Sequence, residues 1–192
     1  MMKKIVLASS SPRRKRLLDQ LDIDFIVAPS NIDETKVEAD NPKDLVQKLS
    51  YLKAKDIACK KDGVIIGADT IVELEDKVLE KPVNIDSAYK MLNNLSGTTH
   101  RVLTGVTIIA DNQSLTDYKT TDVTLRRLSN KEIKDYIATG EPMDKAGGYG
   151  IQSKGAIFVE KIEGSFYNVV GLPLTKLVQM LQELGIVISF NE

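Results

Sequence analysis

The sequence predicts an α/β protein with a mixed, twisted sheet flanked by helices, and three observations support this fold class. Short β-branched runs such as Val64-Ile65-Ile66 alternate with amphipathic segments, which is typical of parallel strands joined by helices. Two strand-like stretches, 101–110 and 115–128, are separated only by Asp111-Asn112-Gln113, which is typical of an antiparallel hairpin. No linker, repeat or low-complexity tract interrupts the 192 residues, so one domain over 1–192 is expected.

The first half of the chain is expected to alternate strands and helices that begin at cap residues. An apolar strand from Lys4 stops at Ser9-Ser10-Ser11, and Ser11-Pro12 is typical of a helix start. Asn41-Pro42 likewise predicts the start of a long helix. The other elements expected here are strands over 25–28 and 64–68, a hairpin of 71–74 and 78–79 turned at Glu75-Asp76, and a helix with Ala88, Met91, Leu92 and Leu95 that stops near Gly97.

The second half continues this pattern after the long hairpin. Ser129 followed by Glu132 predicts a capping box for a helix that ends at Gly140. Pro173 predicts the start of the last helix, with leucines such as Leu177 on its apolar face. The remaining elements expected are strands over 156–162 and 167–170 and a short strand after the last helix.

Composition narrows the functional classes. The 26 basic and 27 acidic residues leave a net charge of -1, which argues against a surface built wholly to bind nucleic acid. Cys59 is the single cysteine; it excludes an internal disulfide, and we expect a buried, inert thiol inside a helix. The apolar stretch after Met1 is too short for a signal peptide, and no membrane-length apolar run follows. We therefore expect a soluble, cytoplasmic protein.

The first chemical signal is the segment from Ser9 to Arg16. Arg13 and Arg14 fall in the first turn of the predicted helix, where the helix dipole favours acidic side chains instead. Free backbone N–H groups and arginines together are typical of a phosphate site. The alternatives are a solvated basic face and a basic patch for nucleic acid.

The second signal is a set of acidic residues near predicted strand ends. Asp69 is expected just past the end of the 64–68 strand, where open α/β sheets bind ligands. The 71–79 hairpin would bring Glu80 and Lys81 back towards it. Asp33-Glu34 follows the second strand. These carboxylates are candidate ligands of a divalent ion; the alternatives are an Asx-turn at Asp69 and solvated side chains elsewhere.

The third signal is the glycine-rich segment 141–152. It is neither a P-loop nor a dinucleotide-binding fingerprint. Its glycines allow close approach of the backbone to a ligand, and Gln152 offers a donor and an acceptor suited to the edge of a base. The alternative is a loop with a surface glutamine. His100 is expected to be structural, so no histidine-based triad is predicted.

Taken together, these segments resemble the Maf family of nucleoside triphosphate pyrophosphatases nearly end to end. The motifs that carry the resemblance, in order, are Leu7-Ala8-Ser9-Ser10-Ser11-Pro12-Arg13-Arg14, Gly67-Ala68-Asp69-Thr70, Glu80-Lys81-Pro82, Leu95-Ser96-Gly97, Asp144-Lys145-Ala146-Gly147, Gly150-Ile151-Gln152 and Val170-Gly171-Leu172-Pro173. The resemblance implies a fold like that of the inosine triphosphatase group, with two lobes around a cleft and a homodimer. It also implies metal-dependent cleavage of a nucleoside triphosphate to the monophosphate and pyrophosphate.

The resemblance also implies a role for individual residues. Asp69 matches the family's proton acceptor, and Gly150-Ile151-Gln152 is similar to the branch that hydrolyses dTTP and UTP, with modified pyrimidine nucleotides as further candidates. The family's phosphate-contacting positions are matched by Ser9, Arg13, Arg14, Lys53 and Lys81. The match at Lys53 is the least secure of these, because Lys55 on the same predicted helix is the alternative. The positions that separate substrate branches are matched by Arg13, Thr70 and Gln152. A Mg²⁺ or Mn²⁺ ion would be held by Asp69 together with Glu34, Asp33 or Glu80.

Two other functional classes remain open at this point. A nucleotide-binding regulator of cell division or septum formation, acting through partners, would use the same anion site without turnover. A nucleic-acid binder using residues 13–16 is disfavoured, because tryptophan is absent and few aromatic residues lie near the basic run.

Overall fold

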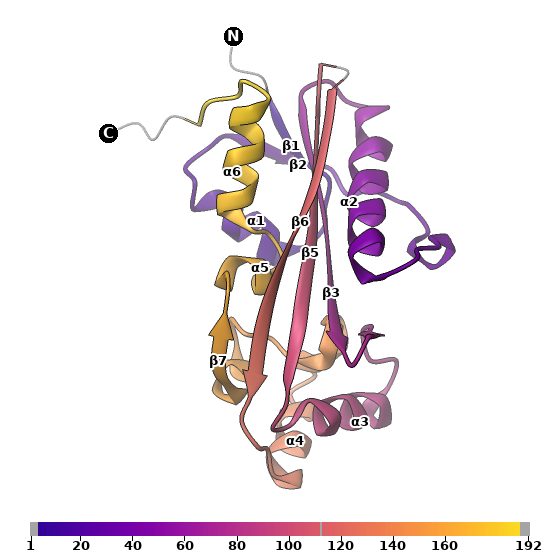
Figure 1. Ribbon diagram of the computed structural model, residues 1–192, viewed down its shortest axis with the longest axis vertical. Coiled ribbons are helices and arrows are strands. Elements are labelled where there is room, and N and C mark those ends of the chain that lie inside the picture. Colours follow the sequence, from indigo (N-terminus) through magenta and orange to yellow (C-terminus); the bar gives the residue numbers. More distant parts are fainter. Residues whose placement is uncertain (1–3, 112, 189–192) are drawn as a thin grey trace. The chain divides into compact units, whose positions relative to one another are not determined.

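A computed structural model describes residues 4–111 and 113–188 (Figure 1). Within these residues the strands form a seven-stranded sheet in the order β2-β1-β3-β5-β6-β7, with β4 paired to β3. Parallel pairs (β1 with β2 and β3) and antiparallel pairs (β3 with β4, β6 with β7) occur together. The expected mixed α/β class is therefore confirmed. The chain divides into two compact units: the first is Met1–Asp69, Thr104–Lys119 and Gly171–Glu192, and the second is Thr70–Leu103 and Thr120–Val170.

The first unit is built around parallel strands with helices on both sides. Its elements are β1 (Ile5–Leu7), α1 (Pro12–Asp19), β2 (Phe25–Val27), α2 (Pro42–Ala58), the first part of β3 (Val64–Leu74), parts of β5 (Thr99–Ala110) and β6 (Gln113–Leu125), and α6 (Leu174–Glu183). Figure 1 shows α2 on one side of these strands and α1 and α6 on the other. One part of its core joins β1 and β3 to α2 through buried Val6, Ile65, Ala54 and Ile57.

The helices of this unit begin where the sequence predicts. The Ser11 side chain caps α1 by accepting the Arg14 N–H at 3.4 Å, with Pro12 at the first helical position. Asn41 caps α2 by accepting the Asp44 N–H at 3.0 Å. Local capping chemistry therefore sets the start of both helices.

A close backbone approach positions α2 over the sheet. A Cβ atom at Gly67 of β3 would lie 2.3 Å from the Ser50 carbonyl oxygen, and one at Gly105 of β5 would lie 2.1 Å from the Val46 carbonyl oxygen. Any side chain at these two glycines would push the helix away. The helix therefore rests directly on the main chain of two strands.

The second unit has its own apolar core. Its elements are the rest of β3, β5 and β6, together with β4 (Lys77–Leu79), α3 (Ile85–Leu95), α4 (Asn130–Ile137), β7 (Val159–Glu163) and α5 (Phe166–Val170). The core includes Leu92, Leu95, Val123, Ile133 and Phe158, all at most 1% exposed. The predicted capping box is confirmed, since Ser129 accepts the Glu132 N–H while Glu132 accepts the Ser129 N–H.

The strand predicted over 64–68 is longer than expected, and this corrects the position of Asp69. β3 continues without a break from Val64 to Leu74, and its end pairs with β4 in the predicted hairpin. The polar pair Asp69-Thr70 resembles a strand end, but the buried β-branched residues Ile71 and Val72 extend the strand beyond it. Asp69 therefore lies inside a strand.

The predicted strand over 167–170 is wrong, because these residues belong to helix α5. Ser165 begins the helix: its side chain accepts the Asn168 N–H at 3.3 Å and its carbonyl accepts the Val169 N–H. The Asn168 side chain is buried and donates to the Val102 carbonyl at 2.9 Å and to the Thr121 hydroxyl at 3.0 Å. These local and buried bonds outweigh the strand propensity of Val169 and Val170.

Three smaller expectations also need correction. The strand predicted over 156–162 begins at Val159, after a 3₁₀ turn over Lys154–Phe158. Residues 185–188 form no strand after α6, and 189–192 lie outside the described residues. Cys59 is exposed because it follows the last residue of α2 instead of facing its apolar side. Among the helices in the described part of the chain, none is long and apolar enough to cross a membrane.

Candidate active site

The start of α1 holds an arginine in a fixed orientation. The Arg14 Nε donates to the Gly171 carbonyl oxygen at 2.8 Å, and its Nη1 donates to the Ser9 hydroxyl at 3.2 Å. Ser9 is buried, and its hydroxyl also accepts the Ser11 N–H at 3.2 Å. Burial lowers the pKa of the Arg14 guanidinium, although the nearby Asp69 charge opposes this. The bonds to Gly171 and Ser9 therefore hold the Arg14 guanidinium in one orientation beside the N-terminus of α1.

A buried lysine joins two carboxylates in the same unit. The Lys53 Nζ of α2 lies 2.5 Å from Asp69 Oδ1 and 2.8 Å from Glu34 Oε1. Lys53 and Asp69 are both largely buried, with 8% and 6% of their surfaces exposed, whereas Glu34 is exposed. The contact follows from strand geometry, because Asp69 shares a sheet face with Gly67, where α2 makes its close approach. The structure thus brings Glu34, Lys53 and Asp69 together.

Burial controls the proton affinity of Asp69. Removal from water raises the pKa of its carboxyl group, and the positive charges of Lys53 and Arg14 oppose this rise. A carboxylate whose pKa is raised above its usual value is a better proton acceptor than a solvated one. The environment of Asp69 therefore suits a general base.

The structure distinguishes between neighbouring candidates that the sequence leaves open. Asp33 caps a 3₁₀ turn over Glu34–Lys36, accepting the Thr35 N–H and hydroxyl at 3.3 and 2.7 Å, while Glu34 reaches Lys53. Lys55 is exposed and lies over the Tyr51 ring, whereas Lys53 contacts Asp69. Lys53 is therefore the lysine that contacts Asp69, and Glu34 is the acidic residue that contacts Lys53.

Of the other predicted residues, all but Arg13 belong to the second unit. Thr70 follows Asp69 on β3 and is half-buried. Glu80 and Lys81 are exposed just after β4, and the Glu80 carbonyl accepts the Gly147 N–H at 3.3 Å. Gln152 is exposed in a turn that is closed by the Ser153 N–H on the Gly150 carbonyl at 3.3 Å. Arg13 is half-buried in the first turn of α1, in the first unit.

His100 has the structural environment that the sequence predicts. It is 2% exposed, and its Nε2 lies 2.8 Å from the Tyr149 hydroxyl oxygen. Burial lowers the pKa of the imidazole to about 4, so the ring is neutral at physiological pH.

Glu34 and Asp69 are the carboxylates in this cluster that could hold a divalent cation. In residues 4–111 and 113–188, no group of three histidine, cysteine, aspartate or glutamate side chains is placed to hold a metal ion. Glu34 and Asp69 nevertheless share one cationic partner, Lys53, so the pair accommodates a positive charge. Mg²⁺ is typically bound by one or two carboxylates, with phosphate and water oxygens completing its shell. These two residues fit that pattern.

The sequence does not indicate the contacts of two further residues. Gly171 orients Arg14 through a backbone carbonyl, which no side-chain pattern can indicate. Glu141 accepts hydrogen bonds from the segment around Gln152. A carboxylate ten or more residues from its partners has no local spacing signal, although it begins the glycine-rich segment.

Known proteins resemble this chain over nearly its whole length. A dTTP/UTP pyrophosphatase from Thermosipho africanus is 52% identical over 184 residues, which cover 96% of this chain and 95% of that protein. A dTTP/UTP pyrophosphatase from Bacillus cereus is 48% identical over 186 residues, covering 96% of this chain and 97% of that protein.

Solved structures support the fold alone. The Ham1 protein of Staphylococcus aureus matches with a TM-score of 0.54 at 14% identity, over 95% of this chain and 100% of that chain. A HAM1 protein from Coxiella burnetii matches with a TM-score of 0.53 at 17% identity and the same coverage. The model of the Maf-like protein family matches residues 4–184, so this chain belongs to the Maf-like protein family.

Proposed function

We propose that this protein is a nucleoside triphosphate pyrophosphatase that hydrolyses dTTP and UTP to the monophosphate and pyrophosphate. Modified pyrimidine nucleotides are further candidate substrates. The observation that carries the proposal is the buried Asp69 carboxylate, 2.5 Å from Lys53 and within the electrostatic influence of Arg14. The names of the relatives from Thermosipho africanus and Bacillus cereus support the same substrate pair.

The proposed reaction adds one water molecule across the bond between the α- and β-phosphates. Asp69 accepts a proton from the attacking water, because burial raises the pKa of its carboxyl group and so favours proton uptake. Arg14 and Lys53, with Lys81 and Arg13, stabilise the negative charge that builds up on the phosphate oxygens and the departing pyrophosphate. The bonds from Arg14 to Gly171 and Ser9 fix its guanidinium before the substrate binds, which lowers the cost of reorganisation.

We also propose that Mg²⁺ or Mn²⁺ is required. Asp69 and Glu34 are the candidate ligands among the residues that meet, and Asp33 and Glu80 remain further candidates. A bound divalent ion would polarise the phosphate and make the attacking water more acidic. Lys53 would then turn from the carboxylates towards phosphate oxygens, because its ammonium competes with the ion for the same two partners.

Base selectivity is assigned to Gln152, with Thr70 and Arg13 contributing. Thymine and uracil present two carbonyl oxygens on either side of one N3–H, and a glutamine amide offers the matching donor and acceptor. Cytosine has an amino group in place of one carbonyl and lacks the N3 donor, so polar groups would be left unpaired. The exposed side chain of Gln152 is available for such contacts. We further propose a cytoplasmic homodimer without nucleic-acid or membrane partners, on the family resemblance alone.

A substrate screen tests the proposal. The wild-type protein is incubated with dTTP, UTP, dCTP, CTP and purine triphosphates with Mg²⁺, Mn²⁺ or EDTA, and monophosphate and pyrophosphate are both measured. We expect pyrophosphate release from dTTP and UTP, loss of activity in EDTA, and a kcat/KM for dTTP about tenfold or more above that for dCTP. Gln152→Ala should reduce this ratio more than it reduces kcat on dTTP. Release of inorganic phosphate without pyrophosphate, or equal rates of hydrolysis for all the triphosphates tested, would refute the assignment.

A further inference from the structure

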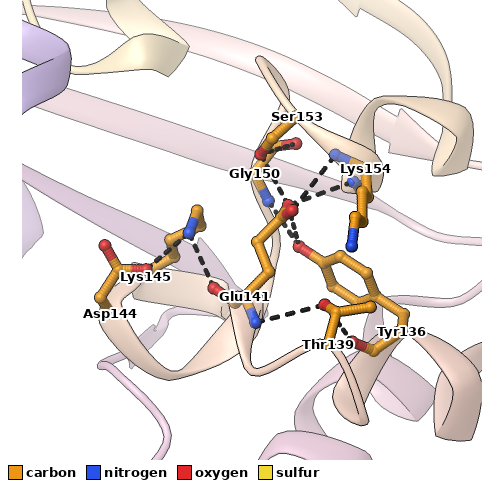
Figure 2. Close-up of polar contacts among 9 residues, drawn as sticks. Tyr136, Thr139, Glu141, Asp144, Lys145, Gly150, Ser153 and Lys154 are labelled. Carbon is orange, nitrogen blue, oxygen red and sulfur yellow. Dashed lines mark hydrogen bonds and ion pairs between the residues drawn. The ribbon is translucent and has the colours of Figure 1, made fainter.

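The carboxylate of Glu141 accepts hydrogen bonds from the three residues that follow Gln152 (Figure 2). It lies in a 3₁₀ turn over Glu141–Asp144, before the glycine-rich segment. One of its oxygens accepts three hydrogen bonds and the other accepts one. The donors are the hydroxyl of Ser153 at 2.6 Å, the hydroxyl of Tyr136 at 2.8 Å, the N–H of Lys154 at 3.2 Å and the N–H of Gly155 at 3.3 Å.

Tyr136 extends this network to the backbone that precedes Gln152. The Gly150 N–H donates to the Tyr136 hydroxyl oxygen at 3.0 Å, while that hydroxyl donates to Glu141. Burial raises the pKa of Tyr136, so its hydroxyl keeps the proton that it donates. Glu141 thus holds both ends of the turn, directly at Ser153 and through Tyr136 at Gly150.

The turn itself leaves little freedom between these two ends. A Cβ atom at Gly155 would lie 2.9 Å from the Tyr136 hydroxyl oxygen and 3.0 Å from the Gly150 carbonyl oxygen. One at Gly150 would lie 2.6 Å from the Ser153 hydroxyl oxygen. The turn therefore packs directly against the groups that hold it, and the backbone position of Gln152 follows from them.

Glu141 is itself held in place. Its N–H donates to the Thr139 hydroxyl oxygen at 3.3 Å, and its carbonyl accepts a bond from the Lys145 ammonium at 2.7 Å (Figure 2). Burial raises the pKa of the Glu141 carboxyl, whereas the hydrogen bonds from Ser153 and Tyr136 lower it. The lowering is the larger effect, so the pKa lies below its usual value. An ionised carboxylate accepts every bond offered to it, and such charge-assisted bonds are strong.

We propose that Glu141 is the positioning residue for Gln152, and that it sets discrimination between thymine or uracil and cytosine by fixing the 150–153 turn. The inference rests on the proposed function of Gln152 in base selection. Glu141 does not touch the reacting atoms; it acts by holding the backbone from which Gln152 extends. Its effect should therefore appear in substrate preference rather than in the rate of the chemical step.

Three variants test this role. Glu141→Gln keeps the size of the side chain but places an NH₂ group where one acceptor oxygen stood. Ser153→Ala removes the shortest bond to Glu141, together with the longer bond from the Ser153 hydroxyl to the Gly150 carbonyl at 3.4 Å. The matched control is Glu132→Gln. Glu132 accepts bonds from Ser129 in the capping box of α4 and from Arg126 at 2.6 Å, and it makes no bond to the 150–155 segment. For each protein we would measure kcat/KM on dTTP and dCTP, urea unfolding, and amide hydrogen exchange at residues 150–155.

The expected result is a dTTP-to-dCTP ratio of kcat/KM about tenfold lower in Glu141→Gln, with kcat on dTTP changed much less. Amide exchange at Gly150, Lys154 and Gly155 should become faster, and Ser153→Ala should show the same changes more weakly. Glu132→Gln should change neither the ratio nor the exchange.

Other outcomes overturn the inference. An unchanged ratio in soluble, folded Glu141→Gln and Ser153→Ala, beside a selective wild-type enzyme, would refute the positioning role and leave the proposed function intact. An equal loss of selectivity in Glu132→Gln would mean that general loosening causes the effect. A wild-type protein that hydrolyses no triphosphate, or all bases equally, would refute the proposed function and this inference with it.

Discussion

The buried imidazole of His100 makes a quantitative prediction about stability. This residue is the only histidine in the chain, and burial lowers its pKa to about 4 from an ordinary value of 6.5. Between these two pH values the unfolded chain binds a proton that the folded protein does not bind. The free energy of unfolding should therefore fall as the pH is lowered through 6.5, and this contribution should be lost completely below pH 4.

The size of the effect follows from the two pKa values. At pH 5 the imidazole in the unfolded chain is mostly protonated while the folded one is mostly neutral, which removes about 2 kcal/mol of stability relative to pH 7.5. The full difference, reached below pH 4, is about 3 kcal/mol. Because only 2% of His100 is exposed, little solvent screening reduces these values.

The assay compares the wild-type protein with His100→Gln by urea unfolding at pH 7.5 and pH 5.0. Glutamine keeps a hydrogen-bonding group for Tyr149 but does not titrate, so the wild-type protein should lose about 2 kcal/mol more than the variant. The raised pKa of Asp69 acts in the opposite direction, since the folded protein takes up that proton first, but it is common to both proteins and cancels. Tyr149→Phe should keep the pH dependence, because burial is the cause of the shift. Equal losses in wild type and His100→Gln would refute the reasoning.

Three further predictions concern the first unit. Asp69→Asn should lower kcat on dTTP about 10²–10⁴-fold, the usual contribution of a general base, and near-wild-type turnover would remove Asp69 from the mechanism. Arg14→Ala should lower kcat/KM by the equivalent of about 1.5–3 kcal/mol. Arg14→Lys should not have wild-type kcat/KM, because an ammonium cannot bond Ser9, Gly171 and a phosphate as the guanidinium does. A wild-type kcat/KM in Arg14→Lys would contradict this role of the guanidinium. Gly67→Ala should destabilise the fold by about 1–3 kcal/mol in urea unfolding, because its Cβ would lie 2.3 Å from the Ser50 carbonyl oxygen; an unchanged stability would show that α2 moves away freely.

Local chemistry explains why much of the fold could be predicted. Ser11-Pro12, Asn41-Pro42 and the Ser129–Glu132 pair specify helix starts through bonds within a few residues, so the sequence contains the whole signal. The 71–79 hairpin was equally local, because Glu75 and Asp76 take the positive φ angles of a tight turn.

The errors arose where distant residues decide the structure. Val169 and Val170 favour a strand locally, but the buried Asn168 amide bonds Val102 and Thr121, which lie far away in the sequence. Asp69 and Thr70 form a polar pair inside β3, and such a pair has the same local pattern as the end of a strand.

In the candidate site, too, local motifs can be recognised in the sequence, whereas contacts between distant residues cannot. Arg14 and Asp69 stand in recognisable motifs, and the contact between Asp69 and Lys53 follows from α2 packing on β3. The bond from Arg14 to the Gly171 carbonyl joins residues 157 positions apart and involves a main-chain atom, so no residue type indicates it.

The close approach of Gly67 to the Ser50 carbonyl has a consequence for which substitutions the candidate site can tolerate. Since two main chains meet there without side chains between them, the spacing between Lys53 and Asp69 is set by atoms that every amino acid shares. Apolar residues elsewhere in this core, such as Ile57 and Ile65, can therefore be exchanged for others of similar volume without altering that spacing. The glycine at position 67 thus makes the distance between Lys53 and Asp69 independent of which apolar residues fill the surrounding core.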